Sequence, residues 1–301
     1  MTDHKSHISV CVCTYKRPEL LGRLLEGLRE QQTKDRFTWS IVVADNDRWE
    51  SAKPTVTRFA TSTGIQATYC VEPRQNIALT RNLAVQNATG DFVAFCDDDE
   101  LPVKRWLLTL FEACEHYGCS GVLGTTKPYF EVQPPDWVIR GAFHERPSYP
   151  TGLVIDWRKG RTSNVLLRRR VFKQGEEPFR PAFRTGEDRD FFRRMIDQGH
   201  RFVWCNEVLT YETIPPVRWR RSFMLRRALL RGQITLQHPV SSRINVMKSV
   251  IAVPAYTIAL PFLLLGGQHL FMKYLIKSFD HAGRLLAFVG LDPVKDAYVT
   301  E

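Results

Sequence analysis

Short apolar runs alternate with longer segments whose apolar residues recur at helical spacing in the first half of the chain. Such runs are typical of buried strands, and the longer segments are typical of amphipathic helices. The predicted strands cover residues 8–13, 39–44, 67–71 and 92–96. The predicted helices cover 18–31 and 51–62, and a loop followed by a helix covers 74–87. Strands that alternate with helices in this way indicate βαβ crossovers and an α/β fold with a parallel sheet.

The pattern becomes less regular in the second half. Residues 128–161 are rich in Pro, Gly and Trp, so we expect loops there. The remaining predicted helices cover 104–117, 187–199, 222–237 and 271–289, and the remaining predicted strands cover 121–126 and 162–167.

Acidic residues follow the strand 92–96 directly, as Asp97, Asp98, Asp99 and Glu100. The carboxyl ends of parallel strands are where α/β sheets bind ligands. Clustered carboxylates suit hard cations such as Mg²⁺ or Mn²⁺, which in turn suit the phosphates of a nucleotide. The alternative is an acidic first turn of a helix that opens near residue 101.

A second acidic pair, Glu187 and Asp188, begins a predicted helix that Gly199 ends. Acids in a first turn are stabilised by the helix dipole, so the pair taken alone favours a structural interpretation.

Several motifs together resemble glycosyltransferase family 2 in order and spacing. No GxGxxG follows the first strand, so a dinucleotide-binding fold loses its main support. Within the family, the chain is most similar to bacterial exopolysaccharide glucosyltransferases of the succinoglycan type. The resemblance spans about residues 8–235, and its motifs are Thr-Tyr-Lys-Arg-Pro-Glu at 14–19, Ala-Asp-Asn at 44–46, Asn-Ile-Ala-Leu-Thr-Arg-Asn at 76–82, Thr-Gly-Asp at 89–91 and Asp-Asp-Asp-Glu at 97–100.

The resemblance implies a GT-A fold, which is Rossmann-like, with a mostly parallel central sheet and helices on both faces. It implies a glycosyltransferase domain over residues 1–237, with a nucleotide-sugar half at 8–126 and an acceptor half at 127–237. Residues 238–301 would form a helical, basic and apolar tail that associates with the membrane.

The family motifs assign donor and metal roles to particular residues. Asp99 and Asp97 would bind the divalent cation, Mn²⁺ or Mg²⁺, and guanidinium groups suit the oxygens of the diphosphate. For Tyr15, a place at the edge of the core is the alternative. The family implies a UDP-linked donor. The residues implied to bind the donor nucleotide are Thr14, Tyr15, Arg17, Asp45, Arg74, Asn76, Arg81, Asp97 and Asp98.

The resemblance also places Asp188 as the catalytic base with Glu187 in support, in a metal-dependent hexosyltransferase that inverts an α-linked donor into a β-linked product. Processive members carry Gln-x-x-Arg-Trp, whereas here Pro215 stands three before Arg218, which favours transfer of a single sugar. Roles as core-edge or surface residues are the alternatives for the acceptor or diphosphate contacts, which are Trp137, Trp157, Arg218, Trp219 and Arg221.

Charge is concentrated in the tail of the 301-residue chain. After Glu212 there are 12 Lys and Arg against 4 Asp and Glu, a net +8 of the chain's +10. No charged residue lies between Lys248 and Lys273, and the basic flanks favour a helical hairpin or interfacial helix pair with both ends cytoplasmic. The alternatives are a buried hairpin of the soluble domain and a homodimer contact. An anionic membrane is therefore the expected partner, and nucleic acid is not.

Two function classes follow. The first is transfer of a sugar from a nucleotide sugar to a lipid-linked saccharide at the cytoplasmic face of the bacterial inner membrane. The second is a non-catalytic protein that binds anionic lipid or nucleic acid through the basic tail. Seven Cys without repeated CxxC spacing, and a polar N-terminus without a secretory signal, favour a reduced, non-exported protein. The two acid centres favour the enzyme, because a binding protein does not need them.

Overall fold

The computed structural model describes residues 5–173, 175–183, 185–237, 243–292 and 294. Two compact units are present, of which unit 1 comprises residues 1–128 and 146–213 and unit 2 comprises 129–145 and 214–301. The predicted division into domains at residue 237 stays a prediction, and its tail, 238–301, includes residues outside the described part.

Unit 1 is built on an eight-stranded sheet with the strand order β3-β2-β1-β4-β7-β6-β8-β5. The first four strands in this order are parallel, and the printed pairings β4 with β7, β6 with β7 and β5 with β8 are antiparallel. The sheet is therefore mixed rather than mostly parallel. The strands are β1 His7–Thr14, β2 Thr38–Asp45, β3 Ala67–Val71, β4 Phe92–Phe95, β5 Glu100–Pro102, β6 Gly121–Tyr129, β7 Val165–Arg168 and β8 Phe202–Thr213.

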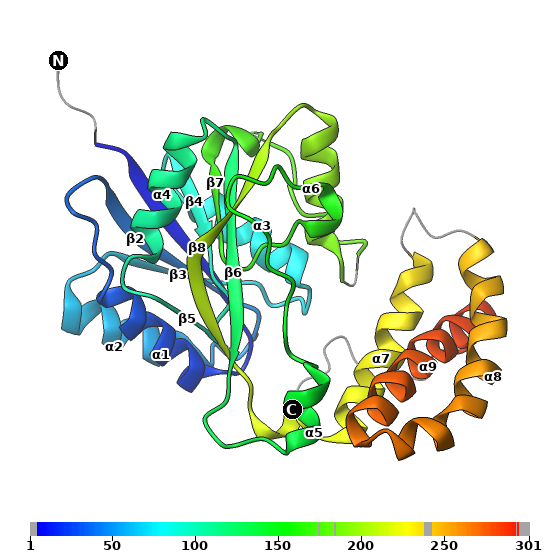
Figure 1. Cartoon of the computed structure of the whole chain (residues 1–301). Helices are drawn as coiled ribbons and strands as arrows, with labels where there is room; N and C mark the ends of the chain where they lie inside the picture. Colours follow the sequence, from blue (N-terminus) through cyan, green and yellow to red (C-terminus); the bar gives the residue numbers. More distant parts are fainter. Residues whose placement is uncertain (1–4, 174, 184, 238–242, 293, 295–301) are drawn as a thin grey trace. The chain divides into compact units, whose positions relative to one another are not determined.

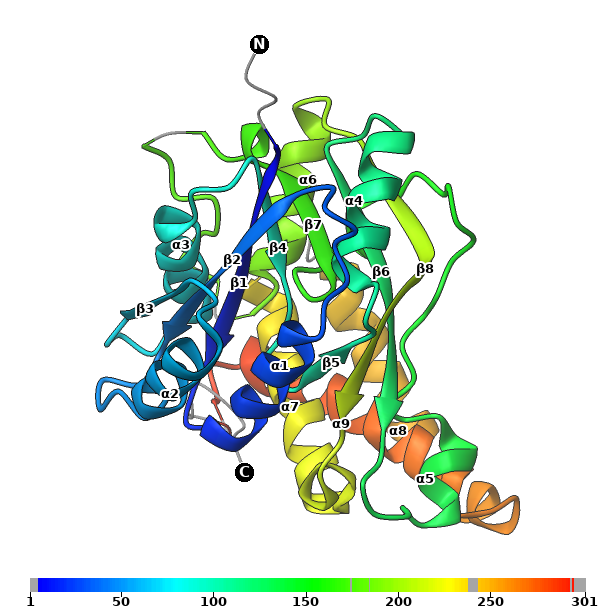
Figure 2. The ribbon, with the colours of Figure 1, turned by 90° about the vertical axis from the view of Figure 1, so that its left-hand side faces the viewer.

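Helices cover both faces of this sheet, as the alternation of strand residues requires (Figures 1 and 2). Val10 and Val12 pack in one core cluster with α1 Pro18–Arg29, α2 Lys53–Thr63 and α4 Trp106–His116. Cys11 points to the other face, where a second cluster joins α3 Ile77–Asn87 and α6 Glu187–Asp197. The core of unit 1 thus consists of two apolar layers on either side of the sheet.

Short helical turns occur within residues 128–161, which the sequence predicts to be irregular. They are α5 Asp136–Gly141 in unit 2 and the 3₁₀ turn η1 Trp157–Lys159 in unit 1. A second 3₁₀ turn, η2 Arg169–Val171, follows β7. The apolar pattern predicts no strand at the positions of β5 or β8. The acidic triplet lies in the turn before β5 rather than in the first turn of a helix.

Unit 2 is helical and contains α7 Arg221–Gln237, α8 Arg243–Leu265 and α9 Gln268–Phe288, after the 3₁₀ turn η3 Pro216–Trp219. Glycines bring α7 and α9 into close contact: a Cβ at Gly232 would meet the carbonyl oxygen of Asp280 at 2.1 Å, and one at Gly283 would meet that of Leu229 at 2.2 Å. Arg231 also forms two hydrogen bonds of 2.7 Å with the Asp280 carboxylate.

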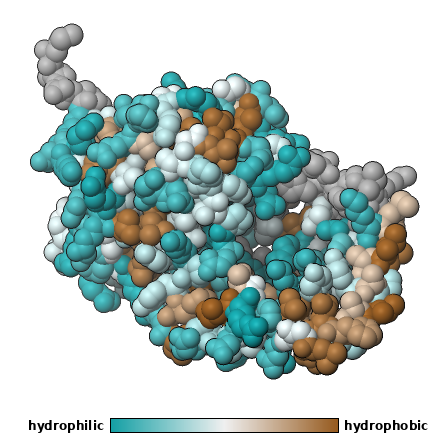
Figure 3. All heavy atoms as spheres, in the orientation of Figure 1, coloured by the Kyte–Doolittle hydropathy of each residue, from teal (hydrophilic) through white to brown (hydrophobic). Residues whose placement is uncertain are grey.

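Helix α8 packs on α9 through one side only. Ser249 forms a hydrogen bond of 2.9 Å with Nδ1 of His281 on α9. Residues Val246–Leu265 are long and apolar enough to cross a membrane, with a mean hydropathy of 1.7 and only 6% of the window buried. Figure 3 shows apolar residues gathered over α8. The buried-hairpin alternative is therefore not supported, because most of this apolar helix is exposed.

Candidate functional site

The acidic triplet lies in the turn between β4 and β5, beside the carboxyl end of β1. Thr14, the last residue of β1, donates a hydrogen bond of 2.8 Å from Oγ1 to Oδ2 of Asp98. Nη1 of Arg17 lies 3.3 Å from Oδ1 of Asp98 and 3.4 Å from Oδ2 of Asp99. The structure thus brings four predicted donor or metal residues together, because β1 and β4 are neighbouring parallel strands.

The three carboxyl groups differ in their partners. Burial, followed by the nearby Asp99, raises the pKa of Asp98 to about 7, against the opposing effect of Arg17. Burial also raises the pKa of Asp97, and Arg81 lowers it. In the part of the chain that the structure describes, the Asp97 carboxylate forms no hydrogen bond or ion pair. Asp97 therefore has its carboxylate available for a ligand.

Asp45, at the end of β2, faces the protein. Its Oδ1 accepts the N–H of Asp47 at 2.9 Å, and its Oδ2 accepts the N–H of Ala52 at 2.9 Å and the hydroxyl of Tyr69 at 2.8 Å. The side chain is fully buried. These bonds hold the loop that follows β2, and a direct contact of Asp45 with the nucleotide stays a prediction.

The segment between β3 and α3 is held at this edge of the sheet by Asn46. Its Nδ2 donates to the carbonyls of Glu72 and Arg74 at 2.8 and 2.7 Å, and its Oδ1 accepts the N–H of Asn76 at 3.0 Å. Asn76 caps α3 by accepting from the N–H groups of residues 78 and 79. The exposed guanidinium of Arg74 makes two hydrogen bonds, of 2.9 and 3.0 Å, to Glu72.

Arg81 connects the two acid centres. From α3 it forms an ion pair with Glu187 at the start of α6, and both side chains are almost fully buried. The negative charges of Asp97 and Asp188 also act on Arg81 and, with Glu187, raise its pKa against the effect of burial. The predicted metal side and the predicted base are therefore within electrostatic reach of one guanidinium.

The predicted catalytic pair divides into a buried and a partly exposed acid. Burial raises the pKa of Glu187 to about 7, against the effect of Arg81, and its Oε2 has no partner among the described residues. Asp188 is partly exposed and its Oδ1 accepts the N–H of Arg189 at 2.7 Å. Asp188 is thus the more exposed acid of the pair, and its role as the catalytic base stays a prediction.

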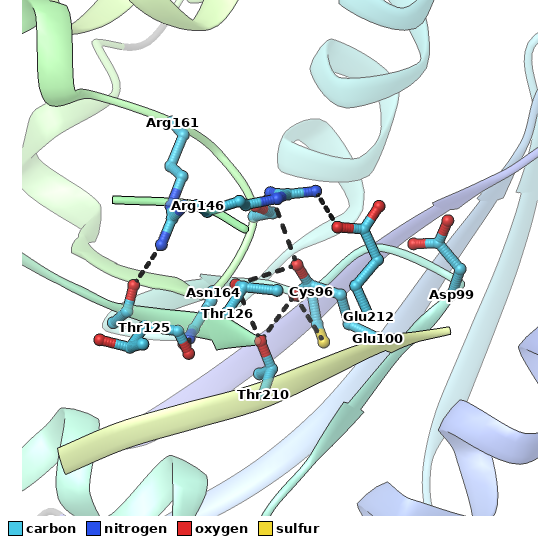
Figure 4. A network of polar contacts seen from close by, with 12 residues as sticks. Cys96, Asp99, Glu100, Thr125, Thr126, Arg146, Arg161, Asn164, Thr210 and Glu212 are labelled. Carbon is cyan, nitrogen blue, oxygen red and sulfur yellow. Dashed lines mark hydrogen bonds and ion pairs between the residues drawn. The ribbon is translucent and has the colours of Figure 1, made fainter. Parts of the chain in front are cut away.

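A buried polar network beside the triplet was missed by sequence reasoning (Figure 4). Glu100 is fully buried and accepts hydrogen bonds from the hydroxyls of Thr126, at 3.2 Å, and Thr210, at 3.3 Å. Arg146 places Nη2 2.6 Å from Glu212 on β8 and Nη1 3.9 Å from Glu100. Only Glu100 carried a sequence signal, since it follows the triplet directly.

The other aromatic candidates lie in different surroundings. Trp157 packs against the core cluster of α3 and α6, and the guanidinium of Arg158 lies 4.6 Å from its ring centre. Tyr15 is partly buried, and Nζ of Lys16 lies 5.3 Å from its ring centre. Stacking of Trp157 on a sugar and contact of Tyr15 with the base stay predictions.

The remaining candidates belong to unit 2, and their roles toward the acceptor or diphosphate stay predictions. The guanidinium of Arg221 lies 5.8 Å from the ring centre of Trp137. The ring of Trp219 lies 5.6 Å from that of Phe130, centre to centre. Arg218 is buried, with 8% of its surface exposed.

The oxygen donors present at the triplet fit a hard divalent cation in kind. Among the described residues, no group of three or more His, Cys, Asp or Glu side chains is arranged around a common metal position. Mg²⁺ at nucleotide sites is, however, commonly bound by one or two carboxylates plus the phosphates of the substrate. The available carboxylate of Asp97, beside Asp99, matches that smaller protein contribution.

Comparison with known sequences gives one family and two related proteins. The family model described as Glycosyl transferase family 2 matches residues 9–197. The succinoglycan biosynthesis protein ExoM of Rhizobium meliloti is 33% identical over 235 residues, which are 77% of this chain and 75% of that protein. Glycosyltransferase AglE of Haloferax volcanii is 22% identical over 214 residues, 69% of this chain and 67% of that one.

Solved structures of low sequence identity share the fold. The mannosyltransferase PcManGT from Pyrobaculum calidifontis, in complex with GDP-Man and Mn²⁺, has a TM-score of 0.61 at 18% identity, covering 94% of this chain and 88% of that chain. S. aureus TarS 1–349 in complex with UDP-GlcNAc has a TM-score of 0.55 at 16% identity, covering 96% and 94%. The chain spans 54% of a longer TarS chain. These likenesses confirm the predicted GT-A type of fold.

Proposed function

Because the chain belongs to glycosyl transferase family 2, we propose that it transfers a single hexose, such as glucose, from a UDP-sugar to a lipid-linked saccharide. The product would be β-linked and would serve bacterial exopolysaccharide or cell-surface glycan synthesis. One observation carries the proposal: Arg81 lies within electrostatic reach of Asp97 on the donor side and pairs with Glu187 beside Asp188.

Asp188 acts as the general base. An acceptor hydroxyl has a pKa far above neutrality, so a carboxylate within hydrogen-bond reach must take its proton as the oxygen attacks the anomeric carbon. Asp188 is partly exposed and fits this role, whereas Glu187 is buried and paired with Arg81. Attack on the face opposite the leaving group needs no covalent intermediate and inverts the anomeric configuration.

The leaving nucleoside diphosphate gathers negative charge. Asp97 and Asp99 would hold the divalent cation, Mn²⁺ or Mg²⁺, which neutralises part of that charge when bound. Arg17 holds Asp98 and Asp99 in place. Thr14 fixes the other oxygen of Asp98, so the turn keeps its shape before the donor arrives.

Membrane association supports the choice of a lipid-linked acceptor. Helix α8 is apolar and largely exposed, and the relative ExoM is named for succinoglycan biosynthesis. We place the enzyme at the cytoplasmic face of the inner membrane, where a lipid-linked saccharide and a soluble nucleotide sugar meet.

Calorimetry with UDP and Mn²⁺ tests the donor site. The unmodified chain should bind UDP more tightly with Mn²⁺ than without it. Asp99→Asn should lower the Mn²⁺-dependent affinity by about tenfold or more, which corresponds to about 1.4 kcal/mol. Asp91→Asn, at the opposite end of β4, is the matched control and should bind UDP as the unmodified chain does. Unchanged affinity in Asp99→Asn would refute its role as a metal ligand.

A screen of nucleotide sugars for release of nucleoside diphosphate then identifies the donor. UDP-glucose is the expected substrate. Release from a GDP-sugar alone would overturn the proposed UDP specificity, and binding of no nucleotide at all would favour a non-catalytic protein.

A further inference from the structure

Arg161 is a partly buried cation close to the candidate site, on the segment that leads into β7 (Figure 4). Its Nη2 donates a hydrogen bond of 2.6 Å to the carbonyl of Gly124 on β6. Its guanidinium also lies 5.0 Å from the ring centre of Trp204 on β8. Arg161 is therefore fixed on the antiparallel half of the sheet, through β6 and β8, and lies within electrostatic reach of Asp97.

The guanidinium of Arg161 is poorly satisfied by the protein. A guanidinium offers five N–H donors. In the described part of the chain, Arg161 has no carboxylate within ion-pair distance, and its Nε is buried without any hydrogen-bond partner. The neighbouring Arg146, by contrast, is paired with Glu212 and lies near Glu100.

Nearby acids pair with Arg146 rather than with Arg161. Glu100 and Glu212 both lie within ion-pair distance of Arg146, whereas Asp97, Glu100 and Glu212 act on Arg161 only from beyond that distance. Burial and the adjacent Arg146 lower the pKa of Arg161 to about 10, which still leaves it charged at pH 7. An unpaired buried charge is unfavourable, and an anion beside Arg161 would relieve that cost.

We propose that Arg161 binds an anionic oxygen group of the acceptor, either the carboxylate of an acidic sugar or a phosphate of the lipid carrier. The inference rests on the proposed function, because it assumes an acceptor beside the donor acids. Both groups present paired oxygens that match the two N–H donors of a guanidinium. A neutral sugar presents no such charged pair. The acceptor is a better source of this anionic group than the donor. Arg161 is held by β6 and β8, whereas the predicted donor residues Thr14 and Asp98 lie at the end of β1 and just after the end of β4.

Binding of small anionic probes to the full chain tests this site. Glucuronate represents the sugar carboxylate, glycerol 1-phosphate represents the lipid phosphate, and glucose is the neutral reference. At least one anion should bind about tenfold more tightly than glucose, and the anion that binds identifies the source. Equal binding of all three probes would overturn the proposal.

Substitutions assign the binding to Arg161. Arg161→Gln should lose about tenfold or more in affinity for the anion, whereas Arg161→Lys should lose less, because it keeps the charge. Arg158→Gln is the matched control, since Arg158 is exposed and lies over Trp157. Unchanged anion affinity in Arg161→Gln would show that Arg161 only joins β6 to β8.

Fluorescence of Trp204 keeps the test decisive where Arg161→Gln does not fold. Anion binding should change the emission of the unmodified chain, and Trp204→Phe should remove that change. A change that persists in Trp204→Phe places the anion elsewhere and overturns the proposal. UDP binding measured on the same proteins separates the two ideas: absent UDP binding contradicts the proposed function, while the anion result stands on its own.

Discussion

Asp188 and Glu187 are adjacent in the sequence, yet they differ in exposure and partners. We expect Asp188→Asn to keep UDP affinity and to lower the rate of sugar transfer by about 10²–10⁴-fold, the usual cost of losing a general base. Turnover and calorimetry on the same preparation measure both quantities. Asp197→Asn, at the exposed end of α6, is the control. Turnover within a few-fold of the unmodified chain would make Asp188 a structural residue.

The buried Glu100 should make stability depend on pH. Because burial raises its pKa from 4.5 to about 8, the folded chain keeps a proton that the unfolded chain releases between these values. Stability should therefore fall as pH rises through this window. In Glu100→Gln, the free energy of unfolding should decrease over this window by less than in the unmodified chain, and the difference should be about 1 kcal/mol or more. The reason is that one pKa unit corresponds to about 1.4 kcal/mol.

Chemical denaturation at several pH values, from about 5 to about 8.5, measures this difference between the two chains. The exposed Glu115, which pairs with Arg168, provides the control Glu115→Gln. Parallel pH profiles for the unmodified chain and Glu100→Gln would show that Glu100 is charged in the folded state.

At the scale of residues, the sequence predicts where the acids lie, but not which carboxylate stays available for a ligand. Parallel strands that end at one edge must bring their following residues together, which is why Thr14, Arg17 and the triplet meet. Which carboxylate stays available depends on side-chain directions. Thr14 and Arg17 turn toward Asp98 and Asp99, and they leave the Asp97 carboxylate without a partner among the residues that the structure describes. No local pattern carries that information.

At the scale of elements, the ion pair of Arg81 and Glu187 joins α3 to α6. Arg81→Met should lower the free energy of unfolding by about 1–3 kcal/mol, less than for a permanently charged partner, because Glu187 can take up a proton. The double variant with Glu187→Gln should recover part of the loss. Urea denaturation measures both, with Arg58→Met on the exposed side of α2 as control. Additive losses would mean that the pair contributes nothing as a pair.

Elements with strong local periodicity could be predicted, and those set by long-range pairing could not. The first three helices and four strands follow the apolar pattern closely. Strand β5 has three residues and exists through its pairing with β8, where Glu100 lies opposite Glu212. Arg146 completes that network from a Pro-rich loop, 46 positions beyond Glu100 along the chain. Such partners become visible only when the sheet is assembled.

At the scale of the whole molecule, α8 presents exposed apolar side chains, among them Ile251, Ile258 and Phe262. Replacing Ile251 and Ile258 by Lys should lower binding to neutral liposomes by tenfold or more, since burial of one such side chain contributes about 1.5–3 kcal/mol. Flotation of the full chain measures it. Truncation at residue 237 would also disturb the fold of the helical unit, because it removes α9, against which α7 packs.

The replacement Val132→Lys, at an exposed apolar residue outside α8, is the control. Anionic liposomes should retain more of the control than neutral ones do, and salt should reduce only that surplus. Equal flotation of the Lys variant and the control would place the membrane contact outside α8.

The glycine contacts between α7 and α9 limit how this helical unit can vary over evolution. At Gly232 and Gly283, even one added methyl group would meet a carbonyl oxygen of the facing helix at 2.1 or 2.2 Å, far inside van der Waals contact. A lineage could exchange one apolar residue of α8 for another with little consequence. A change at either glycine would instead need the two helix backbones to separate, so these positions would be inherited together as a pair.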